Sequence, residues 1–215
     1  MRGGCEATGV FIVNAFPAVE LVTERLLLRI PTEADVDSTV DLFSDELAKT
    51  WLSAPQPYTL EHARAWCTQT APTLRSTGEG INWSVTDLAT GAYLGGVGVG
   101  RTHWLRRTTE IGYAISSSAR GHGFAAEAVR AVSEWVLRDQ AFHRVELFAA
   151  VDNHRSQRVA EKAGFVREGI ARNSGFTHHG QADMAQFSMI PADLKEPGQA
   201  PGSWSAPEPR PWPGR

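Results

Sequence analysis

Cysteine is scarce in this chain. Only Cys5 and Cys67 occur among 215 residues, and they lie far apart in the sequence. A disulfide framework is therefore not expected, and a reducing compartment, the cytoplasm, is the predicted location. Metal-ligand spacings such as C-x-x-C and H-E-x-x-H are absent as well. The adjacent pair His178 and His179 cannot direct both rings at one ion from a helix face, so no metal is expected.

Long apolar runs and a strong net charge are also missing. No run approaches the ~18 apolar residues that a membrane span needs. The short run at 10–13 follows a single basic residue, Arg2, so neither a membrane anchor nor a secretory signal is expected. A formal net charge of -3 gives no electrostatic reason to expect nucleic acid as a partner. The length and the 42% of hydrophobic residues fit one globular domain.

Proline is concentrated at one end of the chain. The stretch from Pro197 to the C-terminus contains proline every few residues, together with glycine and serine. Such a sequence supplies few backbone donors for a helix or a sheet. We therefore expect a disordered or polyproline-like tail at 193–215, a folded domain at 20–192 and an N-terminal extension at 1–19.

Hydrophobic periodicity divides the domain into strands and helices. Strands are predicted at 21–30, 81–86, 93–99, 111–115, 144–151 and 182–190. Helices are predicted at 33–43 after Thr32, at 60–71 between Thr59 and Pro72, from the glycine turn near 121 to about 138, and at 156–163. Gly95, Gly96 and Gly98 within one strand indicate a bulge or the close approach of another backbone. Strands with helices on both faces indicate an α+β or α/β domain built in layers.

The most informative stretch reads A-R-G-H-G-F-A-A at 119–126. It follows a short strand and opens a helix, whose first backbone N–H groups have no partner within the helix and carry partial positive charge. Gly121 and Gly123 let a pyrophosphate approach that backbone, and Arg120 adds a bidentate donor. An ordinary helix start with two turn glycines is the structural alternative.

The same stretch also fits the dinucleotide fingerprint G-x-G-x-x-A, with Asp152 at a tolerable distance after the next strand. That fold normally places the fingerprint in its first βα unit and needs several more units after it. Here over half of the chain precedes the turn. An NAD-binding oxidoreductase is therefore the less favoured alternative.

Together with the glycine turn, R-G-x-G-x-A, three further motifs occur in a fixed order along the chain: T-E-R-L-x-L-R near the start, E-I-G-Y at 110–113 before the turn, and N-x-x-S followed by A-G-F after it. Together they resemble the GNAT superfamily of acyl-CoA N-acyltransferases, in particular the branch of ribosomal-protein N-terminal acetyltransferases. The resemblance runs from about residue 21 to 189. It implies a three-layer α+β fold with helices on both faces of a central, mostly antiparallel sheet, whose fourth and fifth strands splay apart to admit acyl-CoA.

The resemblance also implies which residues bind acetyl-CoA. Main-chain groups of Tyr113, Ala114 and Ile115 would contact the pantetheine arm and polarise the thioester carbonyl. The pyrophosphate would lie on the turn formed by Arg120, Gly121, His122, Gly123, Phe124 and Ala125. Asn153 would bond to the pantetheine, although it also fits a capping residue after a strand.

For catalysis, Glu110 matches the position at which many members keep a general base acting through water. An exposed carboxylate at a strand start is the alternative, and Glu46 and Glu61 are weaker candidates. Many members carry a tyrosine acid in the helix after the asparagine, where this chain has Ala160. Ser156 could instead donate a hydrogen bond to the leaving sulfur.

The sequence thus predicts an enzyme that transfers an acetyl group from acetyl-CoA to a primary amine by direct attack in a ternary complex. The acceptor would be a protein N-terminus or a small-molecule amine, and the enzyme a monomer or a homodimer. An acyl-CoA-binding protein with little catalysis is the alternative from another class.

Overall fold

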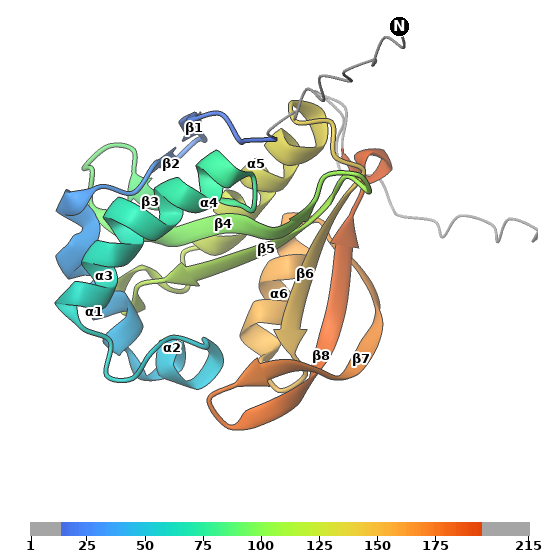
Figure 1. Cartoon of the computed structure of the whole chain (residues 1–215). Coiled ribbons are helices and arrows are strands. Elements are labelled where there is room, and N and C mark those ends of the chain that lie inside the picture. The colour runs from blue at the N-terminus through green and yellow to red at the C-terminus, as the bar shows by residue number, and fades with distance from the viewer. Residues whose placement is uncertain (1–13, 195–215) are drawn as a thin grey trace, which may run out of the picture.

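The structure, a computed structural model, describes residues 14–194. Its centre is a sheet in the order β1-β2-β3-β4-β5-β6-β8-β7 (Figure 1). The strands are β1 (Leu21–Val22), β2 (Leu26–Arg29), β3 (Ile81–Asp87), β4 (Tyr93–His103), β5 (Thr108–Ile115), β6 (Arg144–Ala150), β7 (Val166–Thr177) and β8 (Gly180–Met189). Neighbouring strands are antiparallel except for the pair β5 and β6, which is parallel.

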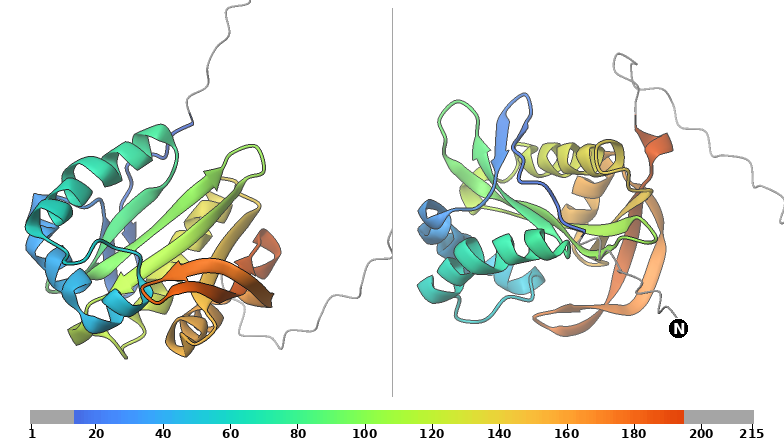
Figure 2. Two further views of the ribbon diagram at one scale, coloured as in Figure 1. Left: turned by 60° about the horizontal axis from the view of Figure 1, so that its bottom comes forward. Right: turned by 45° about the horizontal axis from the view of Figure 1, so that its top comes forward.

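Helices cover both faces of this sheet, which confirms the predicted three-layer α+β architecture. The helices are α1 (Val36–Ser44), α2 (Glu46–Trp51), α3 (Leu60–Ala65), α4 (Ala71–Thr77), α5 (Phe124–Arg138) and α6 (His154–Ala163). The first four lie on one side, while α5 and α6 lie together on the other (Figure 2). One parallel strand pair is too few for a doubly wound dinucleotide fold, so the fold does not support the NAD-binding alternative.

The sheet opens between β5 and β6. Their pairing is confined to Thr108–Glu110 against Arg144–Glu146, after which β5 continues to Ile115 and β6 to Ala150 without pairing to each other. Figure 1 shows the two strands diverging beyond this point. This is the predicted splay. It falls at β5 and β6 because a turn at 23–25 divides the expected strand 21–30 into β1 and β2.

The main core lies between the sheet and α5, and it reaches beyond both ends of the expected domain. The Phe16 ring is 1% exposed and lies 4.9 Å from Trp104 and 6.0 Å from Phe142. The packed part of the chain therefore begins before residue 20. Leu194 also packs against this core. The rest of the expected tail lies outside the described residues, as do residues 1–13.

Pro72 does not end its helix as predicted. A π-helical turn at Trp66–Thr70 joins α3 to α4, and the N–H of Ala71 donates to the carbonyl of Trp66. Pro72 then occupies the first turn of α4, where a missing N–H costs little. The helix accordingly continues to Thr77.

Two elements were not predicted. Strand β7 carries mostly polar side chains on both faces and lies at the sheet edge, so its hydrophobic alternation is weak. Helix α2 is only six residues long and starts at Asp45, whose side chain accepts hydrogen bonds from the N–H groups of Leu47 and Ala48. The bulge indicated by Gly95 is confirmed, since the β3–β4 register shifts between Val85 and Thr86.

A partly buried ion pair joins β2 to the start of α1. Both guanidinium Nη atoms of Arg29 lie 2.7 Å from the carboxylate of Asp35, which is 2% exposed. The N–H of Thr32 and the hydroxyl of Ser84 donate to the same carboxylate. Burial alone would raise the pKa of Asp35, but these hydrogen bonds outweigh it and hold the pKa below its usual value.

We expect Asp35→Asn to lower the free energy of unfolding by about 2–4 kcal/mol near neutral pH, because it leaves Arg29 without its charged partner. Because the pKa of Asp35 is lower in the folded than in the unfolded protein, its carboxylate stabilises the fold at pH values above the unfolded-state pKa. The difference in unfolding free energy between the variant and the parent protein should therefore shrink as pH falls below about 4. Urea unfolding at several pH values measures it. Glu134→Gln, at the pair with Arg130 on α5, is the control and should cost less than about 0.5 kcal/mol. Equal losses in both variants would contradict the assignment.

Candidate active site

The glycine turn forms the N-terminus of α5 as predicted. Gly121 and Gly123 both have φ of 85°, a left-handed conformation that favours glycine, and Gly123 is the N-cap residue. A Cβ added at Gly121 would meet no atom within 4 Å, so this side of the turn is open. His122, Phe124 and Ala125 complete the turn. The N–H groups of this first helical turn are therefore accessible to an anion.

Arg25 holds the turn in place, a role that the sequence did not reveal. Its Nε and Nη2 donate to Oε2 of Glu127 in α5, at 2.8 and 2.5 Å, and its Nη1 donates to the His122 carbonyl at 3.0 Å. The guanidinium also lies 4.7 Å from the Phe124 ring centroid. Thr23 donates to the other oxygen of Glu127 at 2.6 Å. The T-E-R-L segment thus fixes the glycine turn from outside.

Arg120 connects the turn to helix α2. Its Nε donates to the carbonyl of Ile115 at 3.1 Å, and its Nη2 lies 2.5 Å from Oδ1 of Asp45. Asp45 is the N-cap residue of α2, and the hydrogen bond from Arg120 is the main cause that lowers its pKa. Arg120 therefore lies beside the glycine turn, where its guanidinium is bonded to the Ile115 carbonyl and to the Asp45 carboxylate.

Glu110 lies where β5 and β6 part, because it is the last residue of β5 that pairs with β6. Its Oε2 accepts a hydrogen bond from Nη1 of Arg101 at 3.0 Å. Burial raises the pKa of the Glu110 carboxyl, and the charge of Arg101 opposes this shift. The Glu110 side chain is 28% exposed, so solvent reaches this carboxylate only in part.

Beyond Glu110, residues Tyr113, Ala114 and Ile115 continue along the open edge of β5. They pair with β4 on one side, but no β6 residue pairs with them on the other. Main-chain groups directed toward the divergence can therefore bind an extended ligand arm in the manner of a further strand.

Asn153 and Ser156 lie on the other side of the divergence, in the first turn of α6. The Asn153 side chain accepts from the N–H of Ser156 at 3.1 Å, which makes Asn153 the cap of this helix. Ser156 Oγ accepts a hydrogen bond from the phenol of Tyr113 at 3.0 Å. Ala160 is fully buried. Only the main chain of Tyr113 was predicted to take part in the site, whereas its side chain reaches the predicted serine.

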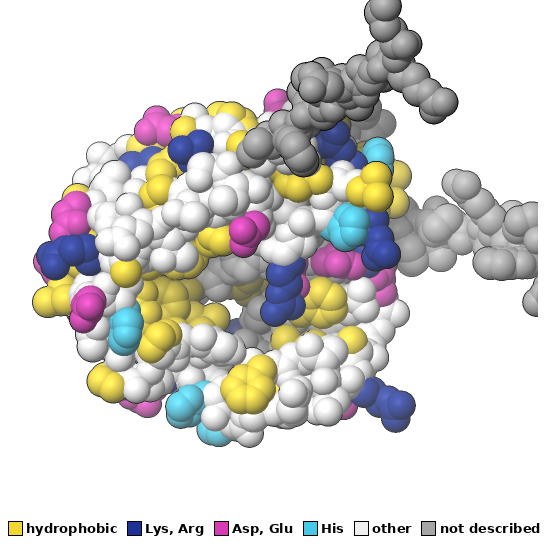
Figure 3. Space-filling model, viewed as in Figure 1, with side chains coloured by type: hydrophobic (Ala, Val, Ile, Leu, Met, Phe, Trp, Pro, Cys, Tyr) yellow, Lys and Arg dark blue, Asp and Glu magenta, His cyan; other side chains and the backbone are white. Residues whose placement is uncertain are grey.

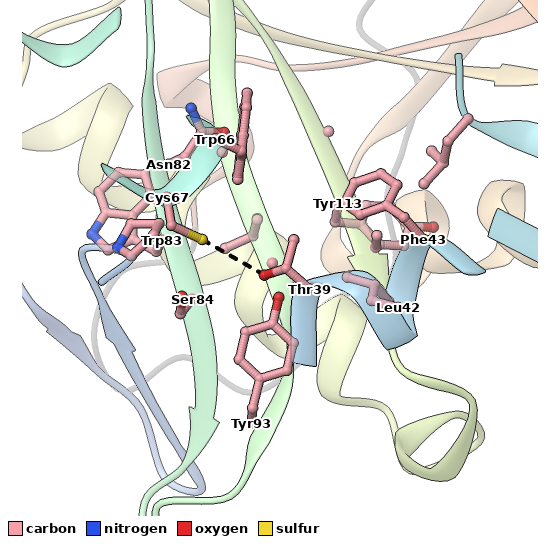
Figure 4. A pocket seen from close by; sticks show the side chains of 17 residues that line it. Thr39, Leu42, Phe43, Trp66, Cys67, Asn82, Trp83, Ser84, Tyr93 and Tyr113 are labelled. Atoms are coloured by element: carbon pink, nitrogen blue, oxygen red, sulfur yellow. Dashed lines mark hydrogen bonds between the residues drawn. The ribbon is translucent and has the colours of Figure 1, made fainter. Parts of the chain in front are cut away.

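A cavity of about 180 Å³ adjoins β5 on the face of the sheet opposite α5 and α6, beneath α1 and the π-helical turn. Its floor consists of positions from β3, β4 and β5 that share one face: Asn82, Ser84, Gly96, Gly98, Gly112 and Ala114. Figure 4 shows the hydroxyl of Tyr93 and the sulfur of Cys67 directed toward Thr39 of α1. Glu110 lies two residues before Gly112 on the same face of β5, although it is not itself a lining residue of this cavity.

The early helices line this cavity through Thr39, Leu42 and Phe43 of α1 and through Trp66 and Cys67 of the π-helical turn. The molecule is hollowed between these helices and the β7–β8 hairpin (Figure 3). Ser53 donates to the carbonyl of Phe176 at 3.0 Å and joins the two sides. The weaker base candidates Glu46 and Glu61 are exposed and line no part of the cavity.

Neither a metal cluster nor a membrane-spanning helix occurs in residues 14–194. No group of three or more His, Cys, Asp and Glu side chains in this part of the chain could hold a metal ion. None of the helices within the same range is long and apolar enough to cross a membrane.

A forked sheet, an open glycine turn and an adjoining cavity define the class of an acyl-CoA-dependent transferase. A profile of the acetyltransferase (GNAT) domain matches residues 25–166, about two thirds of the chain, and the chain belongs to this family. It is accordingly an acyl-CoA-dependent N-acetyltransferase.

Curated relatives agree with this assignment. The uncharacterized N-acetyltransferase YoaA of Bacillus subtilis is 27% identical over 175 residues, which cover 81% of this chain and 97% of the relative. The ribosomal-protein-serine acetyltransferase of Escherichia coli is 28% identical over 97 residues, which cover 45% of this chain and 54% of the relative. These matches support the predicted GNAT branch.

Solved structures share the fold. The ribosomal-protein-S5-alanine acetyltransferase of Vibrio fischeri has a TM-score of 0.71 at 21% identity, over 83% of this chain and 100% of that protein. RimL, a ribosomal L7/L12 alpha-N-protein acetyltransferase in complex with coenzyme A, has a TM-score of 0.72 at 20% identity, over 80% of this chain and 98% of that protein.

We expect Gly123→Val to raise the dissociation constant for acetyl-CoA more than about tenfold, because a β-branched residue resists positive φ and would displace the turn. Isothermal titration calorimetry measures it. Gly180→Val is the matched control, since Gly180 has φ of 102° in the β7–β8 hairpin, away from the turn. Ser156→Ala should also have a smaller effect than Gly123→Val. Similar affinity losses at Gly123 and Gly180 would show that the turn has no special role in binding.

Proposed function

We propose that this chain transfers an acetyl group from acetyl-CoA to a primary amine, and that the amine attacks the thioester directly in a ternary complex. The observation that carries the proposal is the position of Glu110. This carboxylate lies where the sheet opens, on the strand whose next residues on the same face, Gly112 and Ala114, line the cavity beneath α1. Donor and acceptor bound on the two sides would meet beside it.

The donor side would use main-chain groups and the glycine turn. The pyrophosphate would bind the N–H groups at the start of α5, which Arg25 keeps in place. The pantetheine arm would extend along residues 113–115, where an N–H would polarise the thioester carbonyl. Asn153 already caps α6, so its amide nitrogen is the group left to reach the arm.

On the acceptor side, Glu110 would take a proton from the amine through water. A primary ammonium must lose a proton before its nitrogen can attack, and a nearby carboxylate can accept it. The C–N bond then forms as the C–S bond breaks, and the sulfur leaves as thiolate. Coenzyme A is finally released as the thiol after it takes up a proton.

Ser156 would stabilise the leaving thiolate, and Tyr113 would orient it. Because the Tyr113 phenol donates to Ser156 Oγ, the hydrogen of the serine hydroxyl is free to donate to sulfur. Burial raises the pKa of Tyr113 to about 12, which keeps its phenol protonated as a donor. This pair would compensate for Ala160, which replaces the tyrosine acid of other members.

Glu110→Gln should lower kcat/KM near neutral pH by about 10²–10⁴-fold, with little change in acetyl-CoA affinity, because the amide cannot accept a proton. The loss should shrink as pH rises and more amine arrives neutral. Arg101→Met should raise the pKa of Glu110 further, and so move the acidic limb of the parent profile to higher pH. The measurement is kcat/KM against pH with one accepted amine.

The exposed carboxylates Glu46 and Glu61 provide matched controls, and their conversion to glutamine should leave the profile unchanged. Parallel pH profiles for Glu110→Gln and the parent enzyme would remove Glu110 from the mechanism and leave positioning as the main contribution.

Tyr113→Phe and Ser156→Ala should each lower kcat by about 2- to 13-fold, the range for one neutral hydrogen bond, while KM for acetyl-CoA changes little. The double variant should be no slower than the slower single variant, because both changes interrupt the same interaction. Steady-state kinetics on the four proteins measures this. Additive losses would show that Tyr113 and Ser156 act independently, and a change confined to thermal stability would assign the pair a structural role.

A further inference from the structure

The cavity beneath α1 reaches the part of β5 where the thioester would lie. Gly112, Tyr113 and Ala114 of β5 are among its lining residues, and Ala114 belongs to the segment proposed above to hold the pantetheine arm. A group attached to the attacking amine would therefore enter this cavity once the nitrogen reaches the thioester. An inference about the chemistry of that group rests on the proposed function.

Three positions on the floor of the cavity, Gly96, Gly98 and Gly112, carry no side chain. In the cross-strand rows of the sheet, Asn82 lies beside Gly98 and Gly112, and Ser84 lies beside Gly96 and Ala114. A Cβ added at Gly112 would meet no atom within 4 Å. The space above Gly96 and Gly112 is consequently available to a ligand, whereas the Asn82 side chain lies over Gly98, where an added Cβ would come within 2.1 Å of its Oδ1.

The walls are largely aromatic and aliphatic. Phe43 and Leu42 of α1 lie on one side and Trp66 of the π-helical turn on the other, as Figure 4 shows. A volume of about 180 Å³ suffices for one ring, since a cavity of roughly 150 Å³ holds benzene. The cavity therefore fits a single compact group and not a long chain.

The polar groups that face the cavity are neutral. Burial raises the pKa of the Cys67 thiol, and it raises the pKa of Tyr93 to about 12, so both keep their protons. The Asn82 amide carries no charge. Asp35 is the nearby carboxylate, but Arg29, the N–H of Thr32 and Ser84 already occupy its oxygens. No carboxylate among the lining residues could compensate a second ammonium group.

We propose that this cavity selects the acceptor by its side group, and that the preferred substrate is a primary amine bearing one uncharged aromatic or branched aliphatic group close to the nitrogen. Such a group can belong to a free amine or to the first residue of a peptide. Polyamines, which carry a second positive charge into the same space, are selected against.

Acetylation of matched amines tests the preference. We expect kcat/KM for 2-phenylethylamine, or for a peptide that begins with phenylalanine, to exceed the values for ethylamine and spermidine by about tenfold or more. The faster of the two aromatic probes shows whether the preferred acceptor is a free amine or the N-terminus of a peptide. A preference for spermidine, or equal rates with ethylamine and 2-phenylethylamine, would overturn the inference while leaving acetyl transfer established. Absence of transfer to all amines would overturn the proposed function and the inference with it.

Filling the cavity gives the second measurement. At Gly96 an added Cβ would lie 3.6 Å from the carbonyl of Trp83 and 4.0 Å from the Tyr93 hydroxyl, so Gly96→Val fits the backbone and occupies the cavity. Its kcat/KM for the preferred aromatic amine should fall about tenfold or more, with much less change for ethylamine and for acetyl-CoA binding.

Gly169→Ala is the control, because Gly169 lies in β7 with no atom within 4 Å of an added Cβ and outside the cavity. It should preserve the selectivity of the parent enzyme. If the ratio of kcat/KM for the aromatic amine to kcat/KM for ethylamine is the same in folded Gly96→Val protein as in the parent enzyme, the side group of the acceptor binds elsewhere.

Discussion

The site depends on one constraint, which is that β5 and β6 pair over three residues and then part. Parallel strands normally bond along their whole length, so the open edges beyond Glu110 would be costly without another partner. Sheet order supports the opening. β4 holds one edge of β5, while β8 holds the outer edge of β6. The two halves of the sheet are thus each complete, and the line between them is available to a ligand.

The sequence was informative where local chemistry determines local structure. The glycine turn was predicted because Gly121 and Gly123 allow positive φ directly before a helix. The α+β class followed from periodicity, and the register shift near Gly95 followed from glycine within a strand. In each case the signal and the structure involve the same few neighbouring residues.

Features that depend on distant parts of the chain were not predictable in this way. The contact of Arg25 with Glu127 joins residues about one hundred positions apart, and the bond from Tyr113 to Ser156 crosses the opening in the sheet. The cavity combines three strands with α1 and a π-helical turn, and periodicity cannot place those elements against one another. Resemblance to a family identified the positions, whereas three-dimensional packing determined the partners of each side chain.

The position of Arg120 has a thermodynamic consequence. Its guanidinium bonds to Asp45, which caps α2, and it belongs to the turn that faces an incoming anion. An anion that attracts this guanidinium competes with Asp45, so its binding free energy includes the weakening of the α2 cap. Linkage makes such coupling reciprocal: whatever stabilises α2 in its capped position weakens the attraction of Arg120 for the anion by the same amount. The position of helix α2 and the binding of an anion at the glycine turn would therefore be coupled through a single side chain.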